Sequence, residues 1–182
     1  MRTIAIDPVT RLEGHGRIDL FLEEDGSVAN AYMRIPELRG FEAFCVGRPV
    51  EELPRITTRI CGVCPEAHHM ASAKACDAVY QVRIPPAAEK LRRLLYNTFF
   101  VADHAVHFYI LSGPDFVCGP DAPVAERNLF GLIGKVGQET GKKVIGARAR
   151  AQELIKLLGG KSIHQVTSLP GGVTRGPVSY TH

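Results

Sequence analysis

The chain of 182 residues is long enough for one domain with a sizeable core, and its 45% hydrophobic and 23% charged residues are ordinary for a globular protein. A formal net charge of +3, without a long Lys/Arg run, argues against a nucleic-acid partner. No segment approaches the roughly 18 uncharged apolar residues of a membrane span, and the N-terminus turns polar too early for a signal peptide. Together with an odd count of five cysteines, these features favour a cytoplasmic protein with reduced thiols.

Residues 1–36 have the pattern of a β-hairpin region. Apolar residues alternate along GRIDLFLEE, and SVANAYMRI follows across the turn signal Asp25-Gly26. The short stretch TIAI near the N-terminus is expected to join the same sheet. The following segment, up to TTRI, is punctuated by prolines and is expected to form loop and short helix.

Residues 37–182 are expected to be mostly helical. Pro65 suits the first position of a helix that runs to about Gln81. The fold class is therefore α+β, mainly α, with a small N-terminal antiparallel sheet followed by a helical bundle that is incomplete at the C-terminus. The other helices are expected over about 87–111, within 122–140 and over 141–160.

The long helix over 87–111 is apolar on most of its surface, a pattern typical of a buried helix. In this chain taken alone, the bundle is expected to leave part of that apolar surface exposed. The segment that follows the last helix is rich in glycine and proline and is expected to be loop-like.

The stretch RICGVCPEAHHM carries the strongest chemical signal. Cys61 and Cys64 precede the helix that begins at Pro65, and helix-end amides and the macrodipole favour thiolate there. His68 follows Cys64 by four residues, so it lies one helical turn away on the same face. An imidazole in that place can hydrogen-bond a cysteine sulfur, and Arg59 can balance thiolate charge.

Three interpretations of this cysteine pair stay open on the residues alone. A redox dithiol of the thioredoxin type would need a βαβ setting, which the preceding hairpin and loop do not provide. A structural zinc site would need a second matching ligand pair, which Cys76 and Cys118 do not form. An incomplete soft-metal site with further ligands elsewhere is the third. Cys45, Cys76 and Cys118 are expected to be small buried hydrophobes.

Three carboxylates outside this stretch are further candidates. Glu13, in DPVTRLEGH, could relay protons if partly buried, although such a segment is often a charged turn. Glu42, among apolar neighbours in RGFEAFCVGR, suits either a salt bridge or a hard cation such as Mg²⁺. Asp103 shares a helix face with His107, which is consistent with a satisfied core hydrogen bond or with a polar group facing an active site.

These motifs, in this order, resemble the catalytic (large) subunit of nickel–iron hydrogenases, and the likeness extends over nearly the whole chain. DPVTRLEGHGRI resembles the N-terminal signature of that family, and RGFEAFCVGR its next block. RICGVCPEAHHMAS is similar to its first metal-binding motif, while DHAVHFY and HQVTSLPGGV resemble later blocks. In style the chain is most similar to the N-terminal portion of the cytoplasmic, cofactor-coupled branch.

The resemblance implies a role for each candidate. Cys61 would be a terminal nickel ligand, and Cys64 would bridge nickel to an iron that bears CO and cyanide. Glu13 would pass protons and Asp103 would line the open metal position. Further residues would be Glu42 as a ligand of a buried Mg²⁺, His68 as a hydrogen-bond donor to the bridging sulfur, and His164 near the partner subunit. The reaction would be reversible heterolytic cleavage of H₂, with electrons passed to an iron–sulfur small subunit, then to further electron-transfer subunits.

One departure from the family pattern matters. The second metal motif of the family, Asp-Pro-Cys-x-x-Cys-x-x-His, does not occur in these 182 residues. The isolated chain is therefore expected to be inactive and to hold no stable nickel–iron cluster. The alternative is a non-catalytic scaffold of the same fold, as in the related subunit of complex I, although that subunit lacks cysteines at the positions of Cys61 and Cys64.

Overall fold

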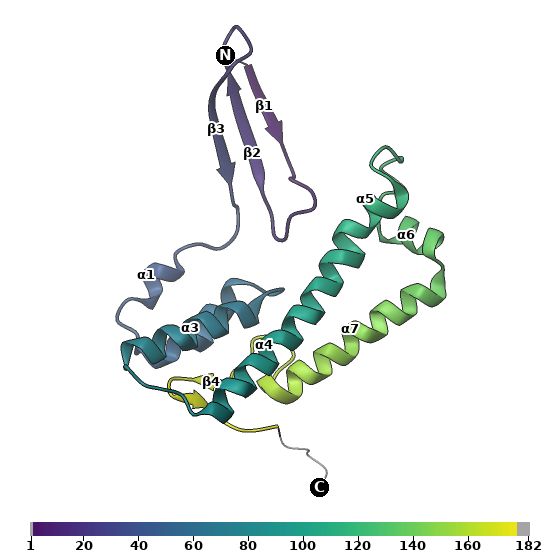
Figure 1. The fold of residues 1–182 in the computed structure, drawn as a ribbon. Coiled ribbons are helices and arrows are strands. Elements are labelled where there is room, and N and C mark those ends of the chain that lie inside the picture. Colours follow the sequence, from purple (N-terminus) through teal and green to yellow (C-terminus); the bar gives the residue numbers. More distant parts are fainter. Residues whose placement is uncertain (1, 178–182) are drawn as a thin grey trace. The chain divides into compact units, whose positions relative to one another are not determined.

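The computed structural model describes residues 2–177, which fall into two compact units, 2–40 and 41–177 (Figure 1). The first unit is an antiparallel sheet in the order β1-β2-β3, with Ile4 opposite Leu20 and Leu20 opposite Ala31. Its strands are β1 (Arg2–Ile6), β2 (Arg17–Leu22) and β3 (Val28–Arg34). The expected hairpin, with TIAI as a third strand, is confirmed.

Asp19 is the buried charge of this sheet, with 1% of its surface exposed. Its carboxylate accepts a 2.8 Å hydrogen bond from Arg17 Nε and pairs with Arg34 Nε at 2.7 Å, so cations from two adjacent strands neutralise it. Breaking a buried pair leaves an uncompensated charge, so these contacts favour the observed register of β2 and β3.

The second unit begins with short helical turns that lead into one regular helix. The turns are α1 (Phe41–Cys45), η1 (Val50–Glu52), α2 (Leu53–Ile56) and η2 (Thr57–Ile60), and the helix is α3 (Pro65–Val79). Proline at the first helical position fixes a helical φ and gives up only an amide that would have no partner there. The helix predicted from Pro65 to about Gln81 is therefore confirmed to within two residues.

Two long helices form the main apolar contact of the second unit. They are α4 (Pro86–Val106) and α7 (Gln138–Gly159), and Figure 1 shows them side by side. The buried cluster between them consists of Leu95, Phe99, Ala102, Ala151 and Ile155. Between them in sequence lie the π-helix η3 (His107–Ser112), α5 (Gly113–Cys118) and α6 (Leu129–Val136).

The end of the described chain returns to α3 and α4 as a small hairpin of β4 (Ser168–Leu169) and β5 (Gly172–Val173). Arg92 of α4, which is 4% exposed, holds this hairpin. Its guanidinium donates to the carbonyls of Leu169 (2.6 Å) and Gly172 (2.9 Å) and pairs with Asp77 of α3. Asp77 in turn accepts the Gly171 amide at 2.8 Å, so one ion pair joins two helices to the hairpin.

The fold class is confirmed, and the differences from the sequence-based expectation are local. The helix predicted over 87–111 forms without interruption, but its geometry changes from α in α4 to π in η3 at His107. The helix predicted within 122–140 begins only at Leu129, because the Asn128 side chain accepts the Phe130 and Gly131 amides and caps it there. The hairpin of β4 and β5 lies where only loop was expected.

Burial agrees with the expectation in part. In the described chain, α4 buries only one face. Leu94 of this helix is 51% exposed and Val101 is 66% exposed, as expected of the chain taken alone. Cys76 is buried as predicted, whereas Cys45 and Cys118 are only half-buried, so the prediction was wrong for those two thiols. Each of them is the last residue of a helix of five or six residues, which is too short to cover its own end.

Glu66, in the first turn of α3, is fully buried, and neither carboxylate oxygen has a hydrogen-bond partner within residues 2–177. Desolvation disfavours the charged carboxylate and raises its pKa from 4.5 to about 8. A carboxyl group in this place is therefore neutral at pH 7 in the folded chain and ionised in the unfolded chain.

We expect Arg92→Lys to lower the free energy of unfolding by about 3 kcal/mol, because one ammonium cannot reproduce the planar set of donors to Asp77 and two carbonyls. Urea denaturation of the chain measures this loss. Arg93→Lys is the matched control: its pair with Glu89 is exposed, and the expected change is below about 0.5 kcal/mol. Equal losses at the two positions would contradict the assigned role of Arg92.

We also expect a pH-dependent stability from Glu66. Since its folded pKa lies above its unfolded pKa, the folded state binds the extra proton, and stability falls as pH rises from 4.5 to about 8. Glu66→Gln should therefore gain stability over the parent chain by more at pH 8 than at pH 5. Denaturation of the metal-free chain at several pH values tests this, with the exposed Glu153→Gln as control. The same pH slope in parent and Glu66→Gln chains would rule out the assignment.

Candidate metal centre

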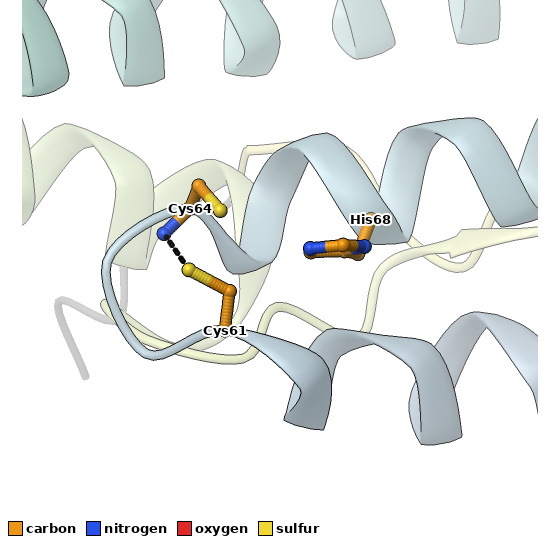
Figure 2. A group of neighbouring side chains, drawn as sticks. All are labelled: Cys61, Cys64 and His68. Atoms are coloured by element: carbon orange, nitrogen blue, oxygen red, sulfur yellow. Dashed lines mark hydrogen bonds between the residues drawn. The ribbon is translucent and has the colours of Figure 1, made fainter. Parts of the chain in front are cut away.

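The loop between η2 and α3 brings three potential ligands together. Cys61 is extended (φ −137°, ψ 134°), Gly62 and Val63 form the turn, and Cys64 caps α3. His68 lies one turn into α3, on the side of the helix that carries Cys64. The two Sγ atoms and an imidazole nitrogen of His68 all lie within 4.8 Å of one another. Figure 2 shows the three side chains.

A backbone amide at the start of α3 contacts one of the two sulfurs. The Cys64 amide donates a 3.1 Å hydrogen bond to Cys61 Sγ, drawn as the dashed line in Figure 2. This amide stands at the N-terminus of α3, where the helix dipole also stabilises anions. Thiolate rather than thiol is the metal-binding form of cysteine, so the loop is arranged for ligation.

The donor set fits a soft or borderline transition metal. Two sulfurs and one imidazole suit nickel, iron or zinc, whereas Mg²⁺ prefers oxygen ligands. All three residues are half-buried, so an ion can reach them. Within residues 2–177 no other group of three such side chains meets the same distance criterion, and three donors leave coordination positions open for ligands from elsewhere.

His69 fixes the helix that presents this group. It is fully buried; its Nδ1 donates to the Pro54 carbonyl at 2.9 Å, and its Nε2 accepts the Ser168 amide at 3.0 Å. The neutral tautomer that carries its proton on Nδ1 therefore has a hydrogen-bond partner for each ring nitrogen. Desolvation by burial lowers the pKa of His69, which keeps the imidazole neutral. Of the two adjacent histidines, His69 is structural and His68 faces the cysteines.

His164 is tied to the same region. Its Nδ1 donates to the Thr58 carbonyl at 2.8 Å, and this bond connects η2 to a segment more than a hundred residues later. His164 adopts a left-handed φ of 56°, which is uncommon for a residue with a side chain. Thr57 contributes a further link to α3, because its hydroxyl donates to the His68 carbonyl at 3.4 Å.

Within the second unit, the predicted carboxylates Glu42 and Asp103 do not join the ligand group. Glu13 lies in the first unit, between β1 and β2, and is exposed. Glu42 is exposed on α1, and Asp103 is half-buried on α4. Neither His104 nor His107 hydrogen-bonds the Asp103 side chain within the described residues: His104 Nδ1 bonds the Phe100 carbonyl, and His107 Nδ1 lies 3.4 Å from Ser112 Oγ.

Sequence reasoning missed the residues that hold the site in place. His69 could have been noticed as the second member of the His-His pair, because it falls on the opposite side of the helix from Cys64. Glu66 carries no local signal of its burial. The link between Asp77 and Arg92 depends on how α3 and α4 pack, which neither residue reveals in the sequence.

No helix among residues 2–177 combines the length and the apolar character needed to cross a lipid bilayer.

Comparison with protein families gives two adjoining matches. Residues 39–128, which contain the ligand group, match the family described as nickel-dependent hydrogenase. Residues 3–38, which correspond to the sheet, match the family described as HoxL-like. The two matches meet close to the boundary between the two compact units.

Individual relatives agree with these matches. The chain is 49% identical over 172 residues to one of the subunits of the vhu F420-non-reducing hydrogenase of Methanocaldococcus jannaschii, covering 94% of this chain and 41% of the relative. It is 40% identical over 178 residues to the NAD-reducing hydrogenase HoxS subunit beta of Cupriavidus necator, covering 94% of this chain and 36% of the relative.

A solved structure extends the agreement to three dimensions. An NAD⁺-reducing [NiFe]-hydrogenase in the H₂-reduced state superposes with a TM-score of 0.86 and 44% identity, over 98% of this chain and 40% of that chain. The chain thus spans about two fifths of the length of the proteins it matches. On sequence, fold and ligand group together, the chain belongs to the nickel-dependent hydrogenase large-subunit family, of which it represents a part.

Proposed function

We propose that the chain forms part of the catalytic subunit of a nickel–iron hydrogenase that cleaves H₂ heterolytically and reversibly. The observation that carries this proposal is the close grouping of Cys61, Cys64 and His68 at the N-terminus of α3. The relatives named above are hydrogenases, which supports the reaction class. Electrons would pass to an iron–sulfur partner subunit, then on to further subunits, in the cytoplasm.

Cys61 and Cys64 would hold the metal centre. Cys61 would be a terminal ligand of nickel, and Cys64 would bridge nickel to an iron with CO and cyanide ligands. When bound, that centre supplies Lewis acidity that polarises H₂. Two thiolates leave the ligand set of nickel incomplete, so the remaining sulfur ligands would come from outside the described residues.

The protein's own groups would handle orientation and protons. His68 would hydrogen-bond the bridging sulfur of Cys64 and tune its basicity. Glu13 would accept the proton released from the site and pass it toward solvent. Asp103 would line the wall of the open position, and Glu42 would bind Mg²⁺ as an oxygen ligand.

A non-catalytic scaffold of the same fold is the second candidate. The observation that favours it is that residues 2–177 offer only three closely spaced donors for a metal. Such a chain would keep the fold and its partner contacts but hold no nickel–iron centre. Nickel content therefore separates the two functions.

We expect Cys61→Ser and Cys64→Ser, each in the complete enzyme, to abolish nickel retention and H₂ oxidation, because hydroxyl oxygen is a poor ligand for a soft metal. Elemental analysis and an H₂-dependent dye assay measure the two effects. Cys118→Ser, a half-buried thiol outside the ligand group, is the control and should retain nickel. Full activity in either ligand variant would refute the nickel assignment.

For Glu13→Gln in the complete enzyme, we expect an intact metal centre with proton exchange slowed at least about 100-fold, because an amide does not relay protons at neutral pH. H/D exchange measures the rate, and infrared bands of CO and cyanide report the centre. Glu23→Gln, at another glutamate of the first unit, serves as control. Exchange at the parental rate would show that Glu13 is only a turn residue.

A further inference from the structure

The loop that carries Glu13 connects β1 to β2 in the first unit, and its backbone has an unusual conformation. The Val9 amide donates to the Gly16 carbonyl at 2.8 Å and closes the loop near its two ends. Inside it, Arg11 (φ 60°) and Gly14 (φ 82°) are both left-handed, which is uncommon for a residue with a side chain. These two residues flank Glu13, so the direction of its side chain depends on a backbone that persists only where its surroundings hold it.

Glu37, in the segment after β3, makes the contact that holds this loop. One of its carboxylate oxygens, Oε1, accepts two hydrogen bonds from His15, from the backbone amide at 2.8 Å and from Nδ1 at 2.6 Å. An ionised carboxylate can only accept, so the ring proton lies on Nδ1. The hydrogen bond from the His15 side chain also lowers the pKa of Glu37, which keeps the carboxylate ionised and therefore an acceptor.

The same oxygen lies against the residue directly after Glu13. A Cβ added at Gly14 would come within 3.3 Å of Glu37 Oε1, so both the close approach and the positive φ favour glycine there. Glu37 therefore contacts both residues that follow Glu13 in the chain, Gly14 through its backbone and His15 through two donors.

This contact adds little to the stability of the sheet. The side chains of His15 and Glu37 are 75% and 49% exposed, and exposed pairs contribute little to the free energy of unfolding. The strands are held instead by their ladder and by the buried Asp19. Loss of Glu37 would therefore leave the first unit folded and loosen only the loop, so the contact serves the orientation of the loop.

We propose that Glu37 is a positioning residue for proton transfer, which orients Glu13 by holding the backbone that follows it. This inference rests on the proposed function, in which Glu13 accepts the proton released from the metal centre. A proton passes only between groups about 2.6–3.2 Å apart, so a small displacement of the loop slows the transfer. Glu37 stays ionised and takes no part in the relay itself.

The test uses three variants of the complete hydrogenase that separate reach from charge. Glu37→Gln keeps an acceptor oxygen at the same reach without the charge, Glu37→Asp keeps the charge at a shorter reach, and Glu37→Ala removes both. Glu24→Ala, at an exposed glutamate between β2 and β3, is the matched control. H/D exchange, kcat, KM for H₂ and the solvent isotope effect are measured, and infrared bands of CO and cyanide report the metal centre.

Glu37→Ala and Glu37→Asp are expected to slow exchange and kcat about tenfold and to raise the solvent isotope effect, because Glu13 meets its proton donor less often in the right geometry. KM for H₂ and the infrared bands stay at their parental values, since binding of H₂ and the metal centre are untouched. Glu37→Gln is expected to remain within about twofold of the parental rate, because its amide oxygen can accept both bonds from His15. The comparison of Gln with Asp decides the question even if Glu37→Ala does not fold.

Parental exchange in both Glu37→Ala and Glu37→Asp, or the same loss in Glu24→Ala, would overturn the proposal. Slowing in Glu37→Gln as large as in Glu37→Ala would also overturn it, because the charge or a proton on Glu37 would then be what matters. Shifted infrared bands in these variants would do the same by locating the effect at the metals. A Glu13→Gln enzyme with parental exchange, or a parental enzyme without nickel, would instead refute the proposed function.

Discussion

The metal loop depends on one buried, neutral imidazole. His69 donates to the Pro54 carbonyl and accepts the Ser168 amide, so a single ring connects the turn before the loop, the helix after it and the terminal hairpin. Protonation would place a second N–H against the Ser168 N–H, which removes one bond and adds repulsion. Because desolvation lowers the pKa of His69, that form is disfavoured, and the start of α3 keeps a fixed orientation.

The same helix combines rigid support with open ligand positions. On one side of α3, His69 is buried with both ring nitrogens bonded, and the half-buried Asp77 pairs with the buried Arg92 of α4. On the other, Cys61, Cys64 and His68 are half-buried and within reach of an ion. A site that must bind a metal gains from ligands whose backbone is already ordered, since less conformational entropy is lost on binding.

Local patterns were sufficient to predict most of the elements and the ligand group. Alternation in GRIDLFLEE, the Asp25-Gly26 turn and Pro65 are signals contained within a few residues, and they produced the sheet and α3 where expected. The spacing of Cys61, Cys64 and His68 is likewise local. By contrast, the hairpin of β4 and β5 forms where its carbonyls meet the donors of the buried Arg92, and the burial of Glu66 depends on distant packing. Such long-range contacts leave no periodic trace in the sequence.

The contacts that support the metal loop also set an order of events during synthesis. Ser168 and His164 bind groups that precede them by 99 and 106 residues. Translation proceeds from the N-terminus, so the cysteine pair leaves the ribosome well before the segment that fixes its backbone. Closing a loop of this length is entropically costly and slow compared with forming α3 itself. The nascent chain therefore passes through an interval in which both thiols are present on an unanchored loop, and chaperone capture or oxidation at that stage competes with assembly of the site.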